Sequence, residues 1–403
     1  MYIARHIQPL LETLVSQFPA ILITGARQVG KSTLLQHITP SYPYFTFDNP
    51  LLLQQANDDP LLLLQNFGQQ AIIDEVQYAP EIFSLLKLEI DKTQRNGLYL
   101  LSGSQAFELM KNVHETLAGR IALLTLHGLS LREIFDVPFY HSFIPHDDYL
   151  QQREQHLKPY TNLWELIHKG DMPRLHTQET HWEIYYSSYV STYIERDVRT
   201  TLQINQPSDF AKFMVAIASR SGDLLNYSNI ANEVGVSADT IKRWVSVLEA
   251  SGIIFLLYPY SNNHLKRAIK TPKVYMLNTG LMAYLTRWLT TETIQNGAQS
   301  GRFFETFVVA EIIKSFTNQG RRPPLYFYRD TNQNEIDLII EEAQTLYPIE
   351  IKTSASPHKK MAKSFAILQS IPDKTIAKGI LISQYPQKLY LDKNLITLPI
   401  EYI

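Results

Sequence analysis

One segment near the N-terminus constrains the fold of this chain more than any other. The apolar, β-branched run Ala20-Ile21-Leu22-Ile23-Thr24 is typical of a buried strand, and Thr33 to His37 continue as a helix. Between them, Gly25 to Ser32 follow the pattern G-x-x-x-x-G-K-S. In phosphate-binding loops of this pattern, glycines let the backbone wrap round the phosphates and helix N-terminal N–H groups supply partial positive charge. The segment predicts a nucleoside triphosphate site, with a simple glycine turn as the alternative.

We expect this loop to bind the phosphates of ATP together with Mg²⁺. Lys31 is expected to reach the β- and γ-phosphates, and Ser32 to offer its hydroxyl to Mg²⁺. The residues expected to surround the phosphates are Gly25, Ala26, Arg27, Gln28, Val29, Gly30, Lys31, Ser32 and Thr33.

An acidic pair follows a second apolar run, Ala71-Ile72-Ile73, where that strand should end. Asp74 is expected to bind the metal. Glu75 is then placed to polarise the attacking water, because phosphoryl transfer depends mostly on positioning and electrostatics. The alternative is that the two acids merely end a strand in solvent. The phosphate-binding pattern upstream favours a single site that the loop and the two acids form together.

Two further positions complete the predicted nucleotide site. The apolar run Leu98 to Leu101 ends in small polar groups, Ser102 to Gln105, that would sense the γ-phosphate or hold the water; an ordinary strand exit is the alternative. Arg120 precedes a last strand-like run, Ile121 to Leu126. An arginine there is expected to stabilise transition-state charge in a neighbouring subunit's site, with a surface cation as the alternative.

Composition narrows the class of protein. A chain of 403 residues is expected to contain about two to three domains. The 45% of hydrophobic residues indicate a globular protein, and the net charge of −2 gives no overall preference for nucleic acid. The lack of cysteine excludes disulfides, zinc-thiolate sites and cysteine nucleophiles. No apolar run approaches membrane-spanning length and Met1 to His6 lack the order of a secretory signal, so we expect a cytoplasmic protein with no membrane partner.

The middle of the chain has the pattern of a winged helix-turn-helix. Ser228 to Val234 are expected to form a short helix, and Ser237 to cap a second helix from Ala238 to about Ala250. The outer face near the start of that second helix carries Lys242 and Arg243, at the end that a recognition helix presents to the DNA major groove. A pure packing or protein-interaction module is the alternative.

The C-terminal region carries a second group of charged residues. Tyr326 to Arg329 and Glu335 to Ile340 are expected to pair as a hairpin, followed by a strand from Leu346 to Thr353. Strand alternation places Glu335 with Asp337 on one face, and Glu350 with Lys352 on one face. Glu305 lies on the otherwise apolar stripe of a predicted helix. We expect Glu305, Asp337 and Glu350 to hold Mg²⁺ against a phosphodiester while Lys352 stabilises developing charge; a simple ion pair between Glu350 and Lys352 is the alternative.

The chain resembles one group of prokaryotic AAA-type ATPases in which a domain related to restriction endonucleases and Holliday-junction resolvases follows the ATPase. The resemblance rests on Ile23 to Ser32, Phe47-Asp48-Asn49-Pro50, Ile73 to Gln77, Leu101 to Gln105, Leu117-Ala118-Gly119-Arg120 and Tyr193-Ile194-Glu195-Arg196-Asp197. It implies that Glu75 is the catalytic glutamate, that Ser102 or Gln105 is the sensor, and that Arg120 acts in trans within a ring. It also implies that Glu305, Asp337, Glu350 and Lys352 form a nuclease-like site, although Ile336 and Asn278 depart from the family pattern.

The predicted architecture is an α/β chain of four parts. These are an AAA-type P-loop domain with a mostly parallel sheet (1–138), a polar insertion and helical linker (139–206), a winged helix (207–260) and a restriction-endonuclease-like α/β domain (261–403). We expect an ATPase that acts on DNA, with short basic patches at Lys266 to Lys273 and Lys352 to Lys363 as candidate backbone contacts. An ATP-driven regulatory switch with an inert C-terminal domain, and a DNA-binding ATPase without cleavage, are the alternatives.

Overall fold

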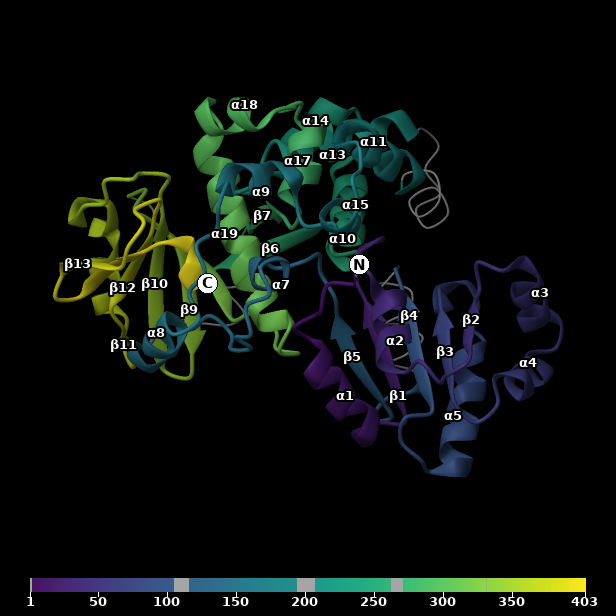
Figure 1. Cartoon of the computed structure of the whole chain (residues 1–403). Helices are drawn as coiled ribbons and strands as arrows, with labels where there is room; N and C mark the ends of the chain where they lie inside the picture. The colour runs from purple at the N-terminus through teal and green to yellow at the C-terminus, as the bar shows by residue number, and fades with distance from the viewer. Residues whose placement is uncertain (1, 105–115, 194–206, 262–270, 331) are drawn as a thin grey trace.

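The computed structural model describes residues 2–104, 116–193, 207–261, 271–330 and 332–403 (Figure 1). Its N-terminal part is a five-stranded parallel sheet in the order β2-β3-β4-β1-β5. The strands are β1 (Ala20–Thr24), β2 (Tyr44–Thr46), β3 (Ala71–Asp74), β4 (Tyr99–Gly103) and β5 (Ile121–Thr125). The mostly parallel sheet predicted for this part is confirmed; β1 has its expected bounds, and the ends of β3, β4 and β5 differ from the expected runs by one or two residues.

Helices cover both faces of this sheet, so β1 is buried along its whole length. Ile21 and Ile23 belong to the core that includes α1 and α2, whereas Ala20 and Leu22 belong to the core that includes α4 and α5. The elements of this part are α1 (Gln8–Gln17), α2 (Lys31–Ile38), α3 (Pro50–Asp58), α4 (Pro60–Phe67), the 3₁₀ helix η1 (Val76–Tyr78), α5 (Ile82–Thr93) and α7 (Leu131–Ile134).

The middle of the chain is helical, including α8 in the polar segment expected to be an insertion. It comprises α8 (Asp147–Glu154), α9 (Leu163–Lys169), α10 (Pro173–Thr177), α11 (Trp182–Tyr193), α13 (Pro207–Ala218), α14 (Tyr227–Val234) and α15 (Ala238–Ala250). Ser237 caps α15 by accepting a hydrogen bond from the Thr240 N–H, as predicted from the sequence. An antiparallel pair follows, formed by β6 (Ile254–Pro259) and β7 (Lys273–Met276).

This pair continues into the C-terminal sheet, because β6 also pairs in parallel with β8. The sheet therefore crosses the predicted boundary at residue 260, and the winged helix stays a prediction. The strand order is β13-β14-β12-β10-β9-β8-β6-β7, with β11 beside β10. The strands are β8 (Leu325–Arg329), β9 (Glu335–Glu342), β10 (Thr345–Ile351), β11 (Thr375–Ile376), β12 (Gly379–Ile382), β13 (Leu389–Asp392) and β14 (Leu395–Leu398). The predicted hairpin is the antiparallel β8–β9 pair.

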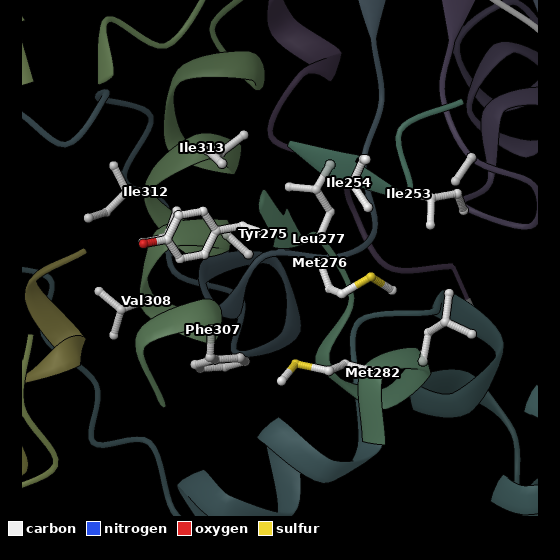
Figure 2. Close-up of a cluster of buried hydrophobic side chains, with 14 of the residues drawn as sticks. Ile253, Ile254, Tyr275, Met276, Leu277, Met282, Phe307, Val308, Ile312 and Ile313 are labelled. Carbon is white, nitrogen blue, oxygen red and sulfur yellow. The ribbon is translucent and has the colours of Figure 1, made fainter. Parts of the chain in front are cut away.

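Helix α19 (Ser300–Thr317) lies near the middle of the molecule, against β7 and β10 of the C-terminal sheet (Figure 1). Figure 2 shows its residues Phe307, Val308, Ile312 and Ile313 in the same buried cluster as residues 275–277 and 253–254. The remaining helical elements are α17 (Thr279–Leu285), α18 (Thr291–Asn296), η3 (Lys359–Ser370) and η4 (Ile400–Tyr402). No helix within the described residues is long and apolar enough to cross a membrane.

Several sequence expectations fall outside the described residues. These are the alternative sensor Gln105, the motif residues Ile194 to Asp197, and the cations Lys266, Arg267 and Lys270.

Candidate functional site

The predicted phosphate loop joins the end of β1 to the start of α2. Gly25 has φ 141°, and a Cβ there would lie 2.0 Å from the carbonyl oxygen of Leu126, so only glycine fits. Gly30 has φ 93° and is the N-cap of α2. The buried Lys31 folds over the loop, where its Nζ donates to the carbonyl oxygens of Gly25 (2.9 Å) and Ala26 (2.8 Å).

Two further loop residues have defined positions. The Arg27 guanidinium donates to the Tyr78 hydroxyl at 3.2 Å, and Gln28 is held at φ 62°. Gly252, just after α15, packs on the loop: a Cβ there would lie 3.4 Å from the Ala26 nitrogen. The predicted DNA-facing helix therefore ends against the phosphate loop.

Asp74 is the acceptor at the centre of the site. It lies at the end of β3 and accepts hydrogen bonds from the hydroxyls of Ser32 (2.6 Å), Ser102 (2.5 Å) and Tyr44 (2.7 Å). The structure thus brings together Ser32, Asp74 and Ser102, three side chains that the sequence assigned to one site. Carboxylate and hydroxyl oxygens are hard donors of the kind that Mg²⁺ prefers, so Ser32 and Asp74 fit the predicted metal role.

Tyr44 was missed by sequence reasoning. It starts β2, the strand beside β3, and this neighbour relation could not be read from the sequence. Burial, together with the adjacent Asp74 carboxylate, raises the pKa of the Tyr44 hydroxyl, which therefore stays a hydrogen-bond donor.

Glu75 follows Asp74 with a left-handed backbone at φ 55°. Its carboxylate accepts hydrogen bonds from the Gln77 amide and, at 3.3 Å, from the Ser104 hydroxyl. Burial raises the pKa of Glu75 above its ordinary value, and the Gln77 bond and the Lys31 charge oppose this effect. A raised pKa suits a group that must accept a proton near neutral pH.

A cavity of about 720 Å³ adjoins the loop. Four parts of the chain that are distant in sequence form its wall: the N-terminal segment, the phosphate loop with the start of α2, the segment after β5, and α10. The lining residues are Tyr2, Ile3, Arg5, Gln28, Val29, Gly30, Thr33, Leu129, Pro173, Arg174, Thr177 and Gln178. Its volume is within the range of small-molecule sites. The sequence had placed only Gln28 to Gly30 and Thr33 near a ligand.

Arg120 lies away from this site. It precedes β5, at the edge of the sheet where the parallel strands begin, whereas the phosphate loop follows the end of β1. Its guanidinium binds both Asp91 oxygens, at 2.5 and 3.1 Å. Arg120 therefore takes no part in the nucleotide site of its own chain, and its role in a neighbouring subunit stays a prediction.

The C-terminal charged residues do converge. Lys352 Nζ lies 2.7 Å from Glu350 and 3.2 Å from Asp337, and the Ile351 N–H donates to Asp337 at 2.9 Å. Glu305 accepts a hydrogen bond from the Tyr275 hydroxyl at 2.6 Å. Sequence reasoning counted Lys273 only as part of a basic patch; its buried ammonium pairs with Glu335 and lies 3.9 Å from Glu305.

Burial and the nearby Asp337 charge raise the pKa of both Glu305 and Glu350 to about 7. Burial alone would lower the pKa of Lys352, but Asp337 and Glu350 outweigh it and raise the pKa. Within the residues that the structure describes, no group of three or more His, Cys, Asp or Glu side chains is arranged to hold a metal ion. The arrangement is thus one of buried carboxylates compensated by two lysines.

Comparisons with known proteins assign the N-terminal part. Residues 17–135 match the family model described as an AAA domain. This part of the chain is therefore similar to AAA domains. Residues 160–292 and 300–403 match two domains of unknown function, DUF8612 and DUF4143. The nuclease-like interpretation of the C-terminal part therefore remains a prediction.

Relatives extend over nearly the whole chain. Uncharacterized proteins of Mycobacterium bovis and Mycobacterium tuberculosis are each 25% identical over 390 residues, which cover 96% of this chain and 81% of theirs. Among solved structures, a Walker-type ATPase of Pyrococcus abyssi has a TM-score of 0.42 at 15% identity and covers 69% of this chain and 94% of its own. The RuvB Holliday junction branch migration motor of Thermotoga maritima has a TM-score of 0.32 at 16% identity, covering 63% and 89%.

Proposed function

We propose that the chain binds ATP with Mg²⁺ at the phosphate loop and hydrolyses its terminal phosphoanhydride bond. The observation that carries this proposal is the convergence of Ser32 and Ser102 on Asp74 beside the phosphate loop. Three sequence segments meet there at the carboxyl ends of neighbouring strands, which is where open α/β sheets bind ligands.

Each residue has a distinct role in the proposed reaction. Backbone N–H groups of the loop and Lys31 hold the phosphates, while Ser32 and Asp74 would hold the metal. When bound, Mg²⁺ supplies neutralising charge to the phosphate oxygens. Glu75 orients the attacking water and accepts its proton, since its raised pKa makes it a better base than an ordinary carboxylate. Ser102 fixes the Asp74 carboxylate.

The test replaces the proposed base. Glu75→Gln is expected to bind ATP with near wild-type affinity and to lose at least about a hundredfold in kcat, because general-base catalysis is commonly worth that much. Glu81→Gln is the matched control, since Glu81 is a nearby exposed glutamate. Turnover by Glu75→Gln at the wild-type rate would remove Glu75 from the mechanism. Failure of the wild-type protein to bind ATP in calorimetry would refute the whole proposal.

DNA is the proposed partner of the C-terminal charged cluster. The cluster gathers Glu305, Asp337, Glu350 and Lys352, the residue types that nuclease chemistry uses. Asp337→Ala and Lys352→Ala should abolish nicking dependent on Mg²⁺ or Mn²⁺ while ATP turnover persists. Nicking by both variants would indicate contamination.

Two alternatives keep the ATPase but change the output. In one, the C-terminal part binds DNA of particular structure without cutting it; ATPase stimulation by DNA, weakened by salt, would then occur without nicking. In the other, it is an inert surface of a regulatory or protein-remodelling switch, and neither branched, duplex nor single-stranded DNA would change the ATPase rate. Either alternative is compatible with a homo-oligomeric ring in which Arg120 completes a neighbouring subunit's site. Such a ring predicts that the specific ATPase activity rises with protein concentration.

A further inference from the structure

Arg5 is a buried arginine that contacts the phosphate loop and also lines the cavity beside it. Its side chain is 3% exposed, and its Nη1 donates to the carbonyl oxygen of Val29 at 2.8 Å. Its Nη2 donates to the carbonyl oxygens of His127 (2.7 Å) and Gly128 (3.2 Å), in the segment after β5. One side chain thus ties the phosphate loop to the segment that follows the edge strand.

Glu133 fixes the position of Arg5 in turn. The Arg5 Nε donates to Glu133 Oε1 at 3.0 Å, and that carboxylate also accepts from the backbone N–H groups of His6 and Ser130, each at 2.7 Å. Burial alone would raise the pKa of Glu133, but Arg5, His6 and these N–H groups outweigh it and lower the pKa. Glu133 therefore stays ionised and holds the guanidinium in one orientation.

The contact at Val29 determines the direction of the next N–H group. A trans peptide unit is planar, so the carbonyl of Val29 and the N–H of Gly30 point in opposite directions. Because Arg5 bonds to that carbonyl, the Gly30 N–H is directed away from the Arg5 guanidinium. Backbone N–H groups of such a loop are the ones that bind phosphate oxygens.

Arg5 itself is not placed to bind phosphate. Four of its N–H groups have acceptors within the protein, and an arginine fork has five. Its guanidinium therefore uses its hydrogen bonds to hold the loop, Glu133 and the segment after β5 together. A lysine could not do the same, because its single ammonium group cannot reproduce the planar fork.

We propose that Arg5 is a positioning residue for ATP, which holds the Val29–Gly30 peptide in the orientation that binds phosphate. This inference rests on the proposed ATP site and adds to it a residue outside the motif. The Gly30 N–H would bind the phosphates equally in the ground state and in the transition state. Loss of its orientation should therefore affect KM more than kcat.

The test combines nucleotide binding with a measurement that needs no nucleotide. Arg5→Ala and Arg5→Lys should raise the Kd and KM for ATP by about tenfold or more, with a smaller change in kcat, as expected for loss of a charge-assisted hydrogen bond. Without nucleotide, amide hydrogen exchange of residues 25–33 should become faster in both variants. Arg5→Lys keeps a charge beside Glu133, so it serves if Arg5→Ala fails to fold.

Arg132→Ala is the matched control. Arg132 is also buried and donates to the carbonyl oxygens of Phe139, His141 and Ile403, but has no bond to the phosphate loop. It should leave the KM for ATP and the exchange of residues 25–33 unchanged. A KM effect as large as that of Arg5→Ala would overturn the proposal. Unchanged exchange of residues 25–33 in Arg5→Lys would also overturn it, whether or not the wild-type protein hydrolyses ATP.

Discussion

Lys314 joins the AAA domain to the rest of the chain, and its removal should be costly. This lysine of α19 is 2% exposed. Its ammonium lies 2.7 Å from Asp171 and 2.9 Å from Glu311, and it donates to the Leu129 carbonyl at 3.0 Å. Burial alone would lower the pKa of Lys314, but the two carboxylates outweigh it and raise the pKa. The group is therefore charged and fully paired.

Lys314→Met keeps the length of the side chain and removes the charge. Because it leaves two carboxylates buried without their cation, we expect a loss of about 3 to 5 kcal/mol in the free energy of unfolding. Lys212→Met is the matched control. Lys212 pairs with Asp209 on the surface, with its side chain 60% exposed, so its loss should cost less than about 1 kcal/mol.

The assay is urea unfolding followed by tryptophan fluorescence. Measuring it at two pH values separates the effect of unpaired buried carboxylates from a general loss of packing. Burial already raises the pKa of Glu311, and Lys314 opposes this effect most strongly; without Lys314, the hydrogen bond from the Leu131 N–H is what remains to oppose it. A folded-state pKa above the unfolded value means that stability falls as pH rises through that interval. The deficit of Lys314→Met should therefore be smaller at pH 5 than at pH 8. A deficit below about 1 kcal/mol, or one independent of pH, would refute the argument.

Three further outcomes are expected. Gly25→Ala should abolish ATP binding in calorimetry, because its Cβ would lie 2.0 Å from the Leu126 oxygen; wild-type affinity would contradict the loop geometry. Arg120→Ala should change the unfolding free energy by less than about 1 kcal/mol, because the Arg120–Asp91 pair is solvent-exposed. Loss of ATPase activity in this stable variant would indicate a role for Arg120 at a subunit interface. A large loss of stability would contradict the expectation for an exposed pair. The acid limb of the kcat–pH profile should lie above the ordinary carboxyl pKa of about 4.3, since burial raises the pKa of Glu75; a limb at about 4.3 would argue against it as the base.

The fold could be predicted wherever local pattern decides it. The buried run at β1, the capping serine of α15 and the β8–β9 hairpin each depend on residues close in sequence, and each was found where expected. The pairing of β6 with β8 was not foreseen. It joins strands more than sixty residues apart, and nothing in either strand specifies its neighbour in the sheet.

The sequence alone predicted the proposed nucleotide site, because Gly25 to Ser32 and the pair Asp74-Glu75 are contiguous groups with a recognisable spacing. The tertiary structure decided what surrounds that site: Tyr44 on Asp74, Arg5 on the Val29 carbonyl, and the α10 wall of the cavity. Such contacts join segments that only the chain topology brings together. A buried polar group must find a partner, but that partner can come from any part of the chain.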